Sequence, residues 1–305
     1  MATKNYGLGY REMGRAGCIA LERAGSAKQL SHESVKKYSL AWVQFTSWAK
    51  EHNVKQMERI SPDLVKQYGQ ELAQKVDDSE IKSSTAQDRV TAVNRVLHFA
   101  GRSDWKPVSS TKECGIAQRI HIREGKPDAL DRNVYLERLA SVASPRGVAI
   151  CELARNLGLR SKEASLLDAR KALHQAKESG FIRVKDGSKG GRLREIPIIN
   201  KGQLDTLQLA SQAQGSAAAV MPPDLNWKQW RQGELRTVRE AVGGLHELRS
   251  AYACERYEAI TGHAAPCAGG QILDKDVDYG ARLVISEELG HGRTDVVSEY
   301  VGGRK

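Results

Sequence analysis

The chain has 305 residues and a net charge of +10 at neutral pH. This length predicts two domains, each with its own core, and the charge predicts a polyanionic partner, most commonly nucleic acid. Five scattered cysteines without a Cys-x-x-Cys pair argue against a zinc site or a disulfide framework, and the lack of a long apolar run argues for a soluble, cytoplasmic protein.

The N-terminal part predicts a small helical bundle. Residues 1–27 are punctuated by glycine, so we expect a loosely attached extension there. From Ser31 the apolar residues recur every three or four positions, and Ser61-Pro62-Asp63 and residues 84–99 predict two further helices. The first of these patterns carries an aromatic face, which we expect to be core rather than a base-stacking surface: Tyr38, Trp42, Phe45 and Trp48. A helical domain over residues 28–105 follows.

Residues 106–127 combine proline, glycine and serine with basic residues. This composition predicts an exposed linker between two domains. The basic excess of the chain is concentrated between residues 106 and 199, whereas residues 200–305 carry slightly more acidic than basic side chains.

The second domain, residues 128–305, is predicted to be α+β. Helical patterns run from about Asp131 and again over residues 148–157. Alternating apolar residues over 181–185 and 193–198 predict a β-hairpin whose glycine-rich tip carries Lys189. The predicted fold class is therefore mainly α with two domains: an N-terminal helical bundle and an α+β domain with a small antiparallel sheet.

Several residue types in the second domain suit phosphodiester cleavage without a metal. Such a reaction needs a nucleophile, fixed positive charge on the non-bridging oxygens and a proton for the leaving oxygen. Arginine provides a permanently charged planar fork for phosphate, and histidine or lysine moves protons near a tyrosine hydroxyl. The candidates follow one another along the chain: Arg160 in Gly158-Leu159-Arg160, Lys189, His246 and Arg249 in an H-x-x-R, His291 in Leu289-Gly290-His291, and Tyr300.

With these motifs in this order, the chain resembles the tyrosine recombinases, the family of phage and mobile-element integrases. The resemblance implies that Tyr300 is the nucleophile, that Arg160 and Arg249 clamp the phosphate, and that Lys189 protonates the leaving 5′-oxygen. His246 and His291 then bind phosphate and transfer protons. Glu163, three residues after Arg160, is implied to orient that arginine, and residues 28–105 are implied to be the DNA-binding core-binding domain.

The implied activity is site-specific DNA cleavage and rejoining through a 3′-phosphotyrosyl link, for integration or excision of a mobile element. The expected partners are double-stranded DNA, copies of the chain in a synaptic tetramer, and accessory DNA-bending proteins, in the cytoplasm at the nucleoid. No cofactor, metal or ATP is expected. Two alternatives stay open: a type IB topoisomerase-like relaxing enzyme and a catalytically silent DNA-binding regulator.

Two features depart from the family pattern. Residues 261–280 look like an insertion, which we expect to be a solvated loop. Only five residues follow Tyr300, too few for the C-terminal helix that many members donate to a neighbouring subunit.

Overall fold

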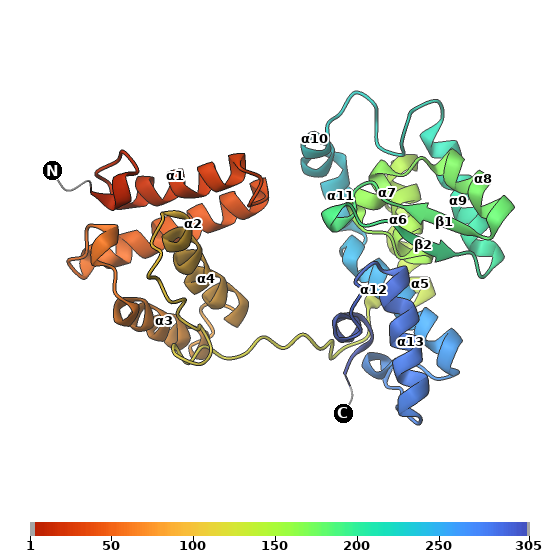
Figure 1. The fold of residues 1–305 in the computed structure, drawn as a ribbon. Helices are drawn as coiled ribbons and strands as arrows, with labels where there is room; N and C mark the ends of the chain where they lie inside the picture. The colour runs from red at the N-terminus through yellow and green to blue at the C-terminus, as the bar shows by residue number, and fades with distance from the viewer. Residues whose placement is uncertain (1–3, 304–305) are drawn as a thin grey trace. The chain divides into compact units, whose positions relative to one another are not determined.

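The computed structural model describes residues 4–303, without the side chain of Lys189. The chain divides into two compact units, Met1–Ile120 and His121–Lys305 (Figure 1). The described residues are mainly helical and contain a two-stranded antiparallel sheet, which confirms the predicted fold class. Within residues 4–303, we find no helix with both the length and the apolar character needed to cross a bilayer.

The first unit is a helical bundle. Its helices are α1 (Met13–Ser26), α2 (His32–Glu51), α3 (Pro62–Asp77) and α4 (Ser83–Phe99). The side chains of Ser31 and Ser61 accept backbone hydrogen bonds at the starts of α2 and α3, as the sequence predicts. Trp42 and Phe45 of α2 are fully buried, with ring centroids 5.5 Å apart. The aromatic face is therefore core, as predicted.

For residues 4–27, which the structure describes, the prediction of a loosely attached extension is wrong. Helix α1 lies along α2 (Figure 1) and buries Met13 and Leu21 completely. The indole Nε1 of Trp42 donates to the carbonyl oxygens of Met13 and Gly14, each at 3.1 Å. A Cβ on Gly17 would lie 2.1 Å from that indole nitrogen. The glycines that suggested a loop instead allow Trp42 to approach the helix backbone closely.

The predicted linker over residues 106–127 is shorter in the structure. Val108, Cys114 and Ile116 are buried in the core of the first unit, while Ala129, just beyond the predicted linker, is buried in the core of the second. Residues 117–126 are the mostly exposed stretch. Proline and glycine therefore mark irregular backbone here, but apolar side chains between them still pack.

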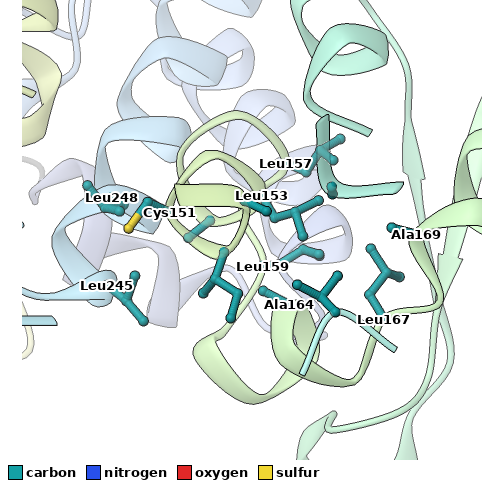
Figure 2. Packing of buried hydrophobic residues seen from close by; sticks show 14 of the residues in the cluster. Cys151, Leu153, Leu157, Leu159, Ala164, Leu167, Ala169, Leu245 and Leu248 are labelled. Atoms are coloured by element: carbon teal, nitrogen blue, oxygen red, sulfur yellow. The ribbon is translucent and has the colours of Figure 1, made fainter. Parts of the chain in front are cut away.

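The second unit is built around helix α6 (Pro145–Leu157). Its other elements are α5 (Arg132–Ala140), α7 (Ser161–Leu166), α8 (Ala169–Ser179), β1 (Phe181–Val184), β2 (Arg194–Pro197), α9 (Lys201–Gln214), α10 (Trp227–Gln232), α11 (Glu234–Ala241), α12 (Leu245–Thr261), α13 (Lys275–Glu288) and α14 (Ser298–Val301). Figure 2 shows Leu153 and Leu157 of α6 among buried side chains that include Leu159, Leu167 and Leu248. This core fixes α7 and α12 relative to each other.

The predicted hairpin forms with Phe181 opposite Pro197 and Val184 opposite Arg194. The core-facing side chains include Ile182, Val184 and Ile196, and Arg194 is buried with them. A charged residue on the inward face of a strand requires a buried partner. The loop between the strands contains a short 3-10 turn, Lys189–Gly191.

The expectation of a solvated loop over residues 261–280 is also wrong in part. A 3-10 turn at Pro266–Ala268 buries Cys267 in the same cluster as Tyr300, and α13 begins at Lys275. Apolar residues in this stretch, such as Ala265, are small, so the hydrophobic pattern of the sequence does not indicate a core position here. The segment supports the helix that carries Tyr300.

Candidate active site

A glycine turn places Arg160 between α6 and α7. Helix α6 ends at Leu157, and Gly158 is left-handed with φ of +62°. A Cβ on Gly158 would lie 2.5 Å from the ring of Tyr252, so a side chain there would both strain the backbone and clash. The backbone N–H of Arg160 donates to Oε2 of Glu163 at 2.7 Å, and its Nη1 donates to Oε1 at 2.8 Å. These two bonds hold the Arg160 side chain at the start of α7.

Glu163 joins three arginines. Its side chain is fully buried and accepts bonds from Nη1 and Nη2 of Arg194 at 2.8 and 2.7 Å. Nη1 of Arg249 lies 3.7 Å from Oε2. Burial raises the pKa of Glu163, but Arg194, Arg249 and the backbone N–H of Arg160 together outweigh burial and lower that pKa from 4.5 to about 2. The carboxylate is therefore charged at neutral pH.

Arg249 of α12 connects this cluster to Tyr300. It is buried, and its Nη2 donates to the carbonyl oxygen of Leu289 at 2.6 Å, while its Nη1 donates to the carbonyl oxygen of Gly158. Its Nε donates to the hydroxyl of Tyr300 at 3.4 Å. Burial lowers the pKa of Arg249 to about 10, and Arg160 adds to this effect. The guanidinium still carries its charge at neutral pH.

His291 provides the shortest contact of the Tyr300 hydroxyl. Nε2 of His291 lies 2.9 Å from that oxygen, and Nη2 of Arg249 lies 3.4 Å from the same nitrogen. Burial first, then Arg249 and Arg160, lowers the pKa of His291 from 6.5 to about 3. The imidazole is therefore neutral at physiological pH, and the tautomer with its proton on Nδ1 accepts the phenol proton at Nε2.

His246 is the second histidine beside the ring of Tyr300. Its ring centroid is 5.2 Å from that of Tyr300, and its side chain is exposed at the surface of the site. Surrounding protein atoms, followed by Arg249, lower the pKa of His246 below 6.5. The neighbouring Glu247 is held by Arg123, whose Nη2 lies 2.5 Å from Oε2 of the carboxylate. His246 is thus placed at the solvent-facing edge of the site.

Two arginines hold the short helix that carries Tyr300. Nη1 of Arg282 donates to the Ser298 hydroxyl and to the carbonyl oxygen of Gly302, each at 3.0 Å. The backbone N–H of Arg123 donates to the carbonyl oxygen of Ser298 at 2.9 Å. Tyr300 itself is buried. Both ends of α14 are therefore anchored within the same unit as the rest of the site.

The side chain of Lys189 lies outside the described part of the structure, but both flanks of its loop touch the site. A Cβ on Gly187 would lie 2.7 Å from the carbonyl carbon of Lys162, two residues after Arg160. On the other flank, Nη1 of Arg192 donates to the carbonyl oxygen of His291 at 3.4 Å. The backbone at position 189 is thus tethered between the neighbourhoods of Arg160 and His291.

Comparison with known proteins finds a family model similar to part of the second unit. The sequence model described as Integrase matches residues 121–255. No curated protein sequence matches the chain significantly. The match covers most of the second unit and less than half of the whole chain. The resemblance to the tyrosine recombinases that the motifs indicate is thereby confirmed.

Solved tyrosine recombinases share the fold. XerH site-specific recombinase, solved on a palindromic difH substrate after cleavage, has a TM-score of 0.59 at 13% identity, with 95% of this chain and 82% of that chain covered. The Tn1549 transposon integrase with circular intermediate DNA has a TM-score of 0.58 at 10% identity, covering 95% and 96%. A lambda integrase tetramer on a Holliday junction has a TM-score of 0.53 at 16% identity, covering 92% and 77%.

Within the second unit, five of the six predicted catalytic side chains are described and meet in one cluster with Glu163: Arg160, His246, Arg249, His291 and Tyr300. A pocket of about 370 Å³ opens beside them, and its lining includes Arg160, Arg231, Arg239, His246 and Arg249. The described residues contain no group of three or more His, Cys, Asp or Glu side chains placed to hold a metal ion. The arrangement suits an anionic phosphate.

Three supporting arginines of the domain are not among the residues predicted from the sequence. Arg194 falls on the inward face of a predicted strand, so strand alternation together with its charge signals a buried partner. Arg123 and Arg282 act on α14 from distant parts of the chain. Nothing in their local sequence distinguishes them from surface arginines.

Proposed function

We propose that the protein cleaves and rejoins double-stranded DNA at specific sites through a covalent 3′-phosphotyrosyl link to Tyr300. The observation that carries this proposal is the hydroxyl of Tyr300, which lies 2.9 Å from a neutral His291 and 3.4 Å from the guanidinium of Arg249. A phenol is a poor nucleophile at neutral pH, so a neighbouring base and fixed positive charge are what it needs.

In the proposed cleavage step, the oxygen of Tyr300 attacks the scissile phosphorus while its proton passes to Nε2 of His291. Arg160 and Arg249 stabilise the charge that develops on the non-bridging oxygens, because their guanidinium forks match phosphate geometry. The bond to the 5′-oxygen breaks, and Lys189 on the hairpin protonates that oxygen. His246, at the open edge of the site, binds the phosphate.

Rejoining reverses these steps. A 5′-hydroxyl attacks the phosphotyrosyl phosphorus and passes its proton to the amine of Lys189, while Tyr300 leaves and His291 returns the proton to the phenol oxygen. One phosphodiester is exchanged for another, so the reaction needs neither ATP nor a hydrolytic water. Glu163 supports both directions because it holds Arg160, and through the same carboxylate it contacts Arg249.

The proposed partner is double-stranded DNA, bound by a tetramer that joins two duplexes. The net charge of +10 and the basic lining of the 370 Å³ pocket support DNA binding. The similar lambda integrase is a tetramer on a Holliday junction, and the similar Tn1549 protein is a transposon integrase. These likenesses support a role in integration or excision of a mobile element. We further propose that the protein acts at the nucleoid with accessory DNA-bending proteins.

The test is a covalent adduct on nicked duplexes. Duplexes selected from a random-sequence pool by binding to the full chain are rebuilt with a nick beside each phosphate in turn, so that the short cleaved strand is lost and the link is trapped. The native protein is expected to give an adduct that resists detergent, and Tyr300→Phe is expected to bind DNA but give none. Tyr279→Phe is the matched control, because Tyr279 is exposed on α13. An adduct with Tyr300→Phe would refute the assignment.

Strand exchange separates recombination from topoisomerase-like relaxation. With the selected site on two labelled duplexes, the proposal expects recombinant products that carry both labels. Relaxation of a supercoiled plasmid lacking the site, without recombinants, would instead identify a relaxing enzyme. Binding without any adduct on the selected duplexes would identify a silent DNA-binding protein.

A further inference from the structure

Two buried cysteines meet behind the tyrosine. Cys254 lies on α12 and Cys267 in the 3-10 turn Pro266–Ala268, and their sulfurs are 3.6 Å apart. Neither is in a disulfide. At this separation the two sulfur atoms are in contact, and a disulfide requires them to close from 3.6 Å to about 2.05 Å.

Both thiols also contact the backbone of the proposed nucleophile. Sγ of Cys254 and Sγ of Cys267 lie 3.6 and 3.5 Å from the carbonyl oxygen of Tyr300, and each thiol donates to it. A Cβ on Gly302 would lie 2.7 Å from the backbone nitrogen of Cys267, so the two segments pack backbone against backbone. A displacement of Cys267 is therefore transmitted to the chain on both sides of Tyr300.

We propose that Cys254 and Cys267 form an oxidation site at which a hydroperoxide closes a disulfide, and that this disulfide slows DNA cleavage by Tyr300. This inference rests on the proposed function, because cleavage is the activity it regulates. The reduced pair is the active form, and a thiol reductant restores it.

The chemistry balances with hydrogen peroxide as the oxidant. The thiolate of Cys267 attacks one peroxide oxygen, the O–O bond breaks, and the departing hydroxide leaves as water after protonation, which makes a sulfenic acid. The thiol of Cys254 then attacks that sulfur, the S–O bond breaks and a second water leaves. Two thiols have lost two electrons to the peroxide, and the S–S bond has formed.

The surroundings favour Cys267 as the first nucleophile. When Cys267 is ionised, the Cys254 thiol can turn its proton from the Tyr300 carbonyl to the thiolate. This hydrogen bond lowers the pKa of Cys267 although burial opposes it, and the nearby Arg123 acts in the same direction. The same pairing and burial raise the pKa of Cys254. Cys267 is also slightly more accessible, at 7% exposure against 1% for Cys254. A small oxidant therefore meets the more acidic thiol first.

The disulfide acts on Tyr300 in two ways. It removes both S–H donors from the carbonyl oxygen of Tyr300, and it draws the Cys267 turn toward α12. Because a misplacement of about 1 Å in a reacting group costs up to about a hundredfold in rate, we expect cleavage to slow by at least about tenfold. Because both cysteines contact the backbone of Tyr300 and neither contacts His291, we expect the 2.9 Å contact between the Tyr300 hydroxyl and Nε2 of His291 to lengthen.

The experiment compares the full chain after treatment with hydrogen peroxide and after treatment with dithiothreitol. Mass spectrometry of alkylated digests is expected to show a Cys254–Cys267 linked peptide only after peroxide, with the adduct rate on nicked duplexes lowered at least about tenfold and restored by dithiothreitol. Cys254→Ala and Cys267→Ala are each expected to lose the difference between the two treatments. Cys18→Ser, in the first unit, is the matched control and is expected to keep it.

Absence of the linked peptide, or a linked protein with an unchanged adduct rate, would overturn the inference. A reduced protein that forms no adduct at all would instead refute the proposed function. Hydrogen exchange of residues 298–303 tests, independently of cleavage activity, whether the disulfide changes the backbone around Tyr300. Faster exchange in the linked protein supports it, and identical exchange in both forms overturns it.

Discussion

Replacing Glu163 with glutamine isolates the charge that holds the arginine cluster. The wild-type carboxylate is fully buried, and interactions with Arg194, Arg249 and Arg160 bring its pKa from 4.5 to about 2. Each pKa unit corresponds to about 1.4 kcal/mol, so the displacement corresponds to about 3 kcal/mol of stability. Removal of one partner from a buried ion pair typically costs about 3–5 kcal/mol, which agrees. The amide that replaces the carboxylate also places its N–H donors opposite the N–H donors of the arginines, which is unfavourable.

The assay is peptide-resolved hydrogen exchange of α12 in the full chain. At pH 7 we expect Glu163→Gln to exchange about a hundredfold faster than wild type wherever exchange requires unfolding of the second unit. The matched control is Glu195→Gln, one residue after Arg194. Its carboxylate forms an exposed ion pair with Arg183 at 2.9 Å, so we expect a change below about 0.5 kcal/mol.

The difference in stability between wild type and Glu163→Gln depends on pH in a defined direction. Because the folded-state pKa of Glu163 is lowered, its contribution is complete above pH 4.5 and is lost as the pH falls toward 2. The gap in stability between wild type and Glu163→Gln is therefore expected to narrow across that window. Equal exchange for Glu163→Gln and Glu195→Gln at pH 7 would refute the reasoning.

Three further predictions follow from the geometry of the same domain. Arg194→Lys keeps a positive charge but loses the paired hydrogen bonds to Glu163 at 2.8 and 2.7 Å, so it is expected to lower both the melting temperature and the DNA adduct rate. An unchanged melting temperature would contradict this expectation. The pKa of His291 is lowered to about 3, so the folded state resists protonation of this side chain, and the free energy of unfolding is expected to fall as the pH drops from 6.5 toward 3. In denaturant titrations, His291→Gln is expected to make the free energy of unfolding depend less steeply on pH across this range. Gly158→Ala combines φ of +62° with a Cβ 2.5 Å from Tyr252, and is expected to lose at least about 1–2 kcal/mol in the same titrations, whereas alanine at the exposed Gly101 meets only the backbone strain.

The sequence predicts candidate site residues where the proposed chemistry restricts the residue type. A phosphate clamp, a proton acceptor and a nucleophile leave few choices, so Arg160, Arg249, His291 and Tyr300 stand out once they are read together. The hairpin and the helix starts were also predictable, because alternation and serine caps are local signals. Ser61 before Pro62 marks the start of α3, as the structure has it.

Other features depend on contacts between distant residues. Gly17 looks like a helix breaker until Trp42, twenty-five positions later, is seen against it. Arg282 holds both Ser298 and Gly302, yet its own sequence context is that of an ordinary surface helix. The sequence around Cys267 predicts a solvated loop because small residues and glycines surround it, whereas the structure buries the turn. Local pattern carries no information about such pairings, so only the fold reveals them.

The most direct test of the account is the identity of the residue that becomes linked to DNA. The trapped adduct is digested with nuclease and protease, and the nucleotide-bearing peptide is sequenced by mass spectrometry. The account predicts a single modified peptide with a 3′-linked nucleotide on the oxygen of Tyr300, 2.9 Å from His291 in the free protein. A nucleotide on any other side chain, or a cleaved strand that ends in a free phosphate with no linked peptide, would contradict it.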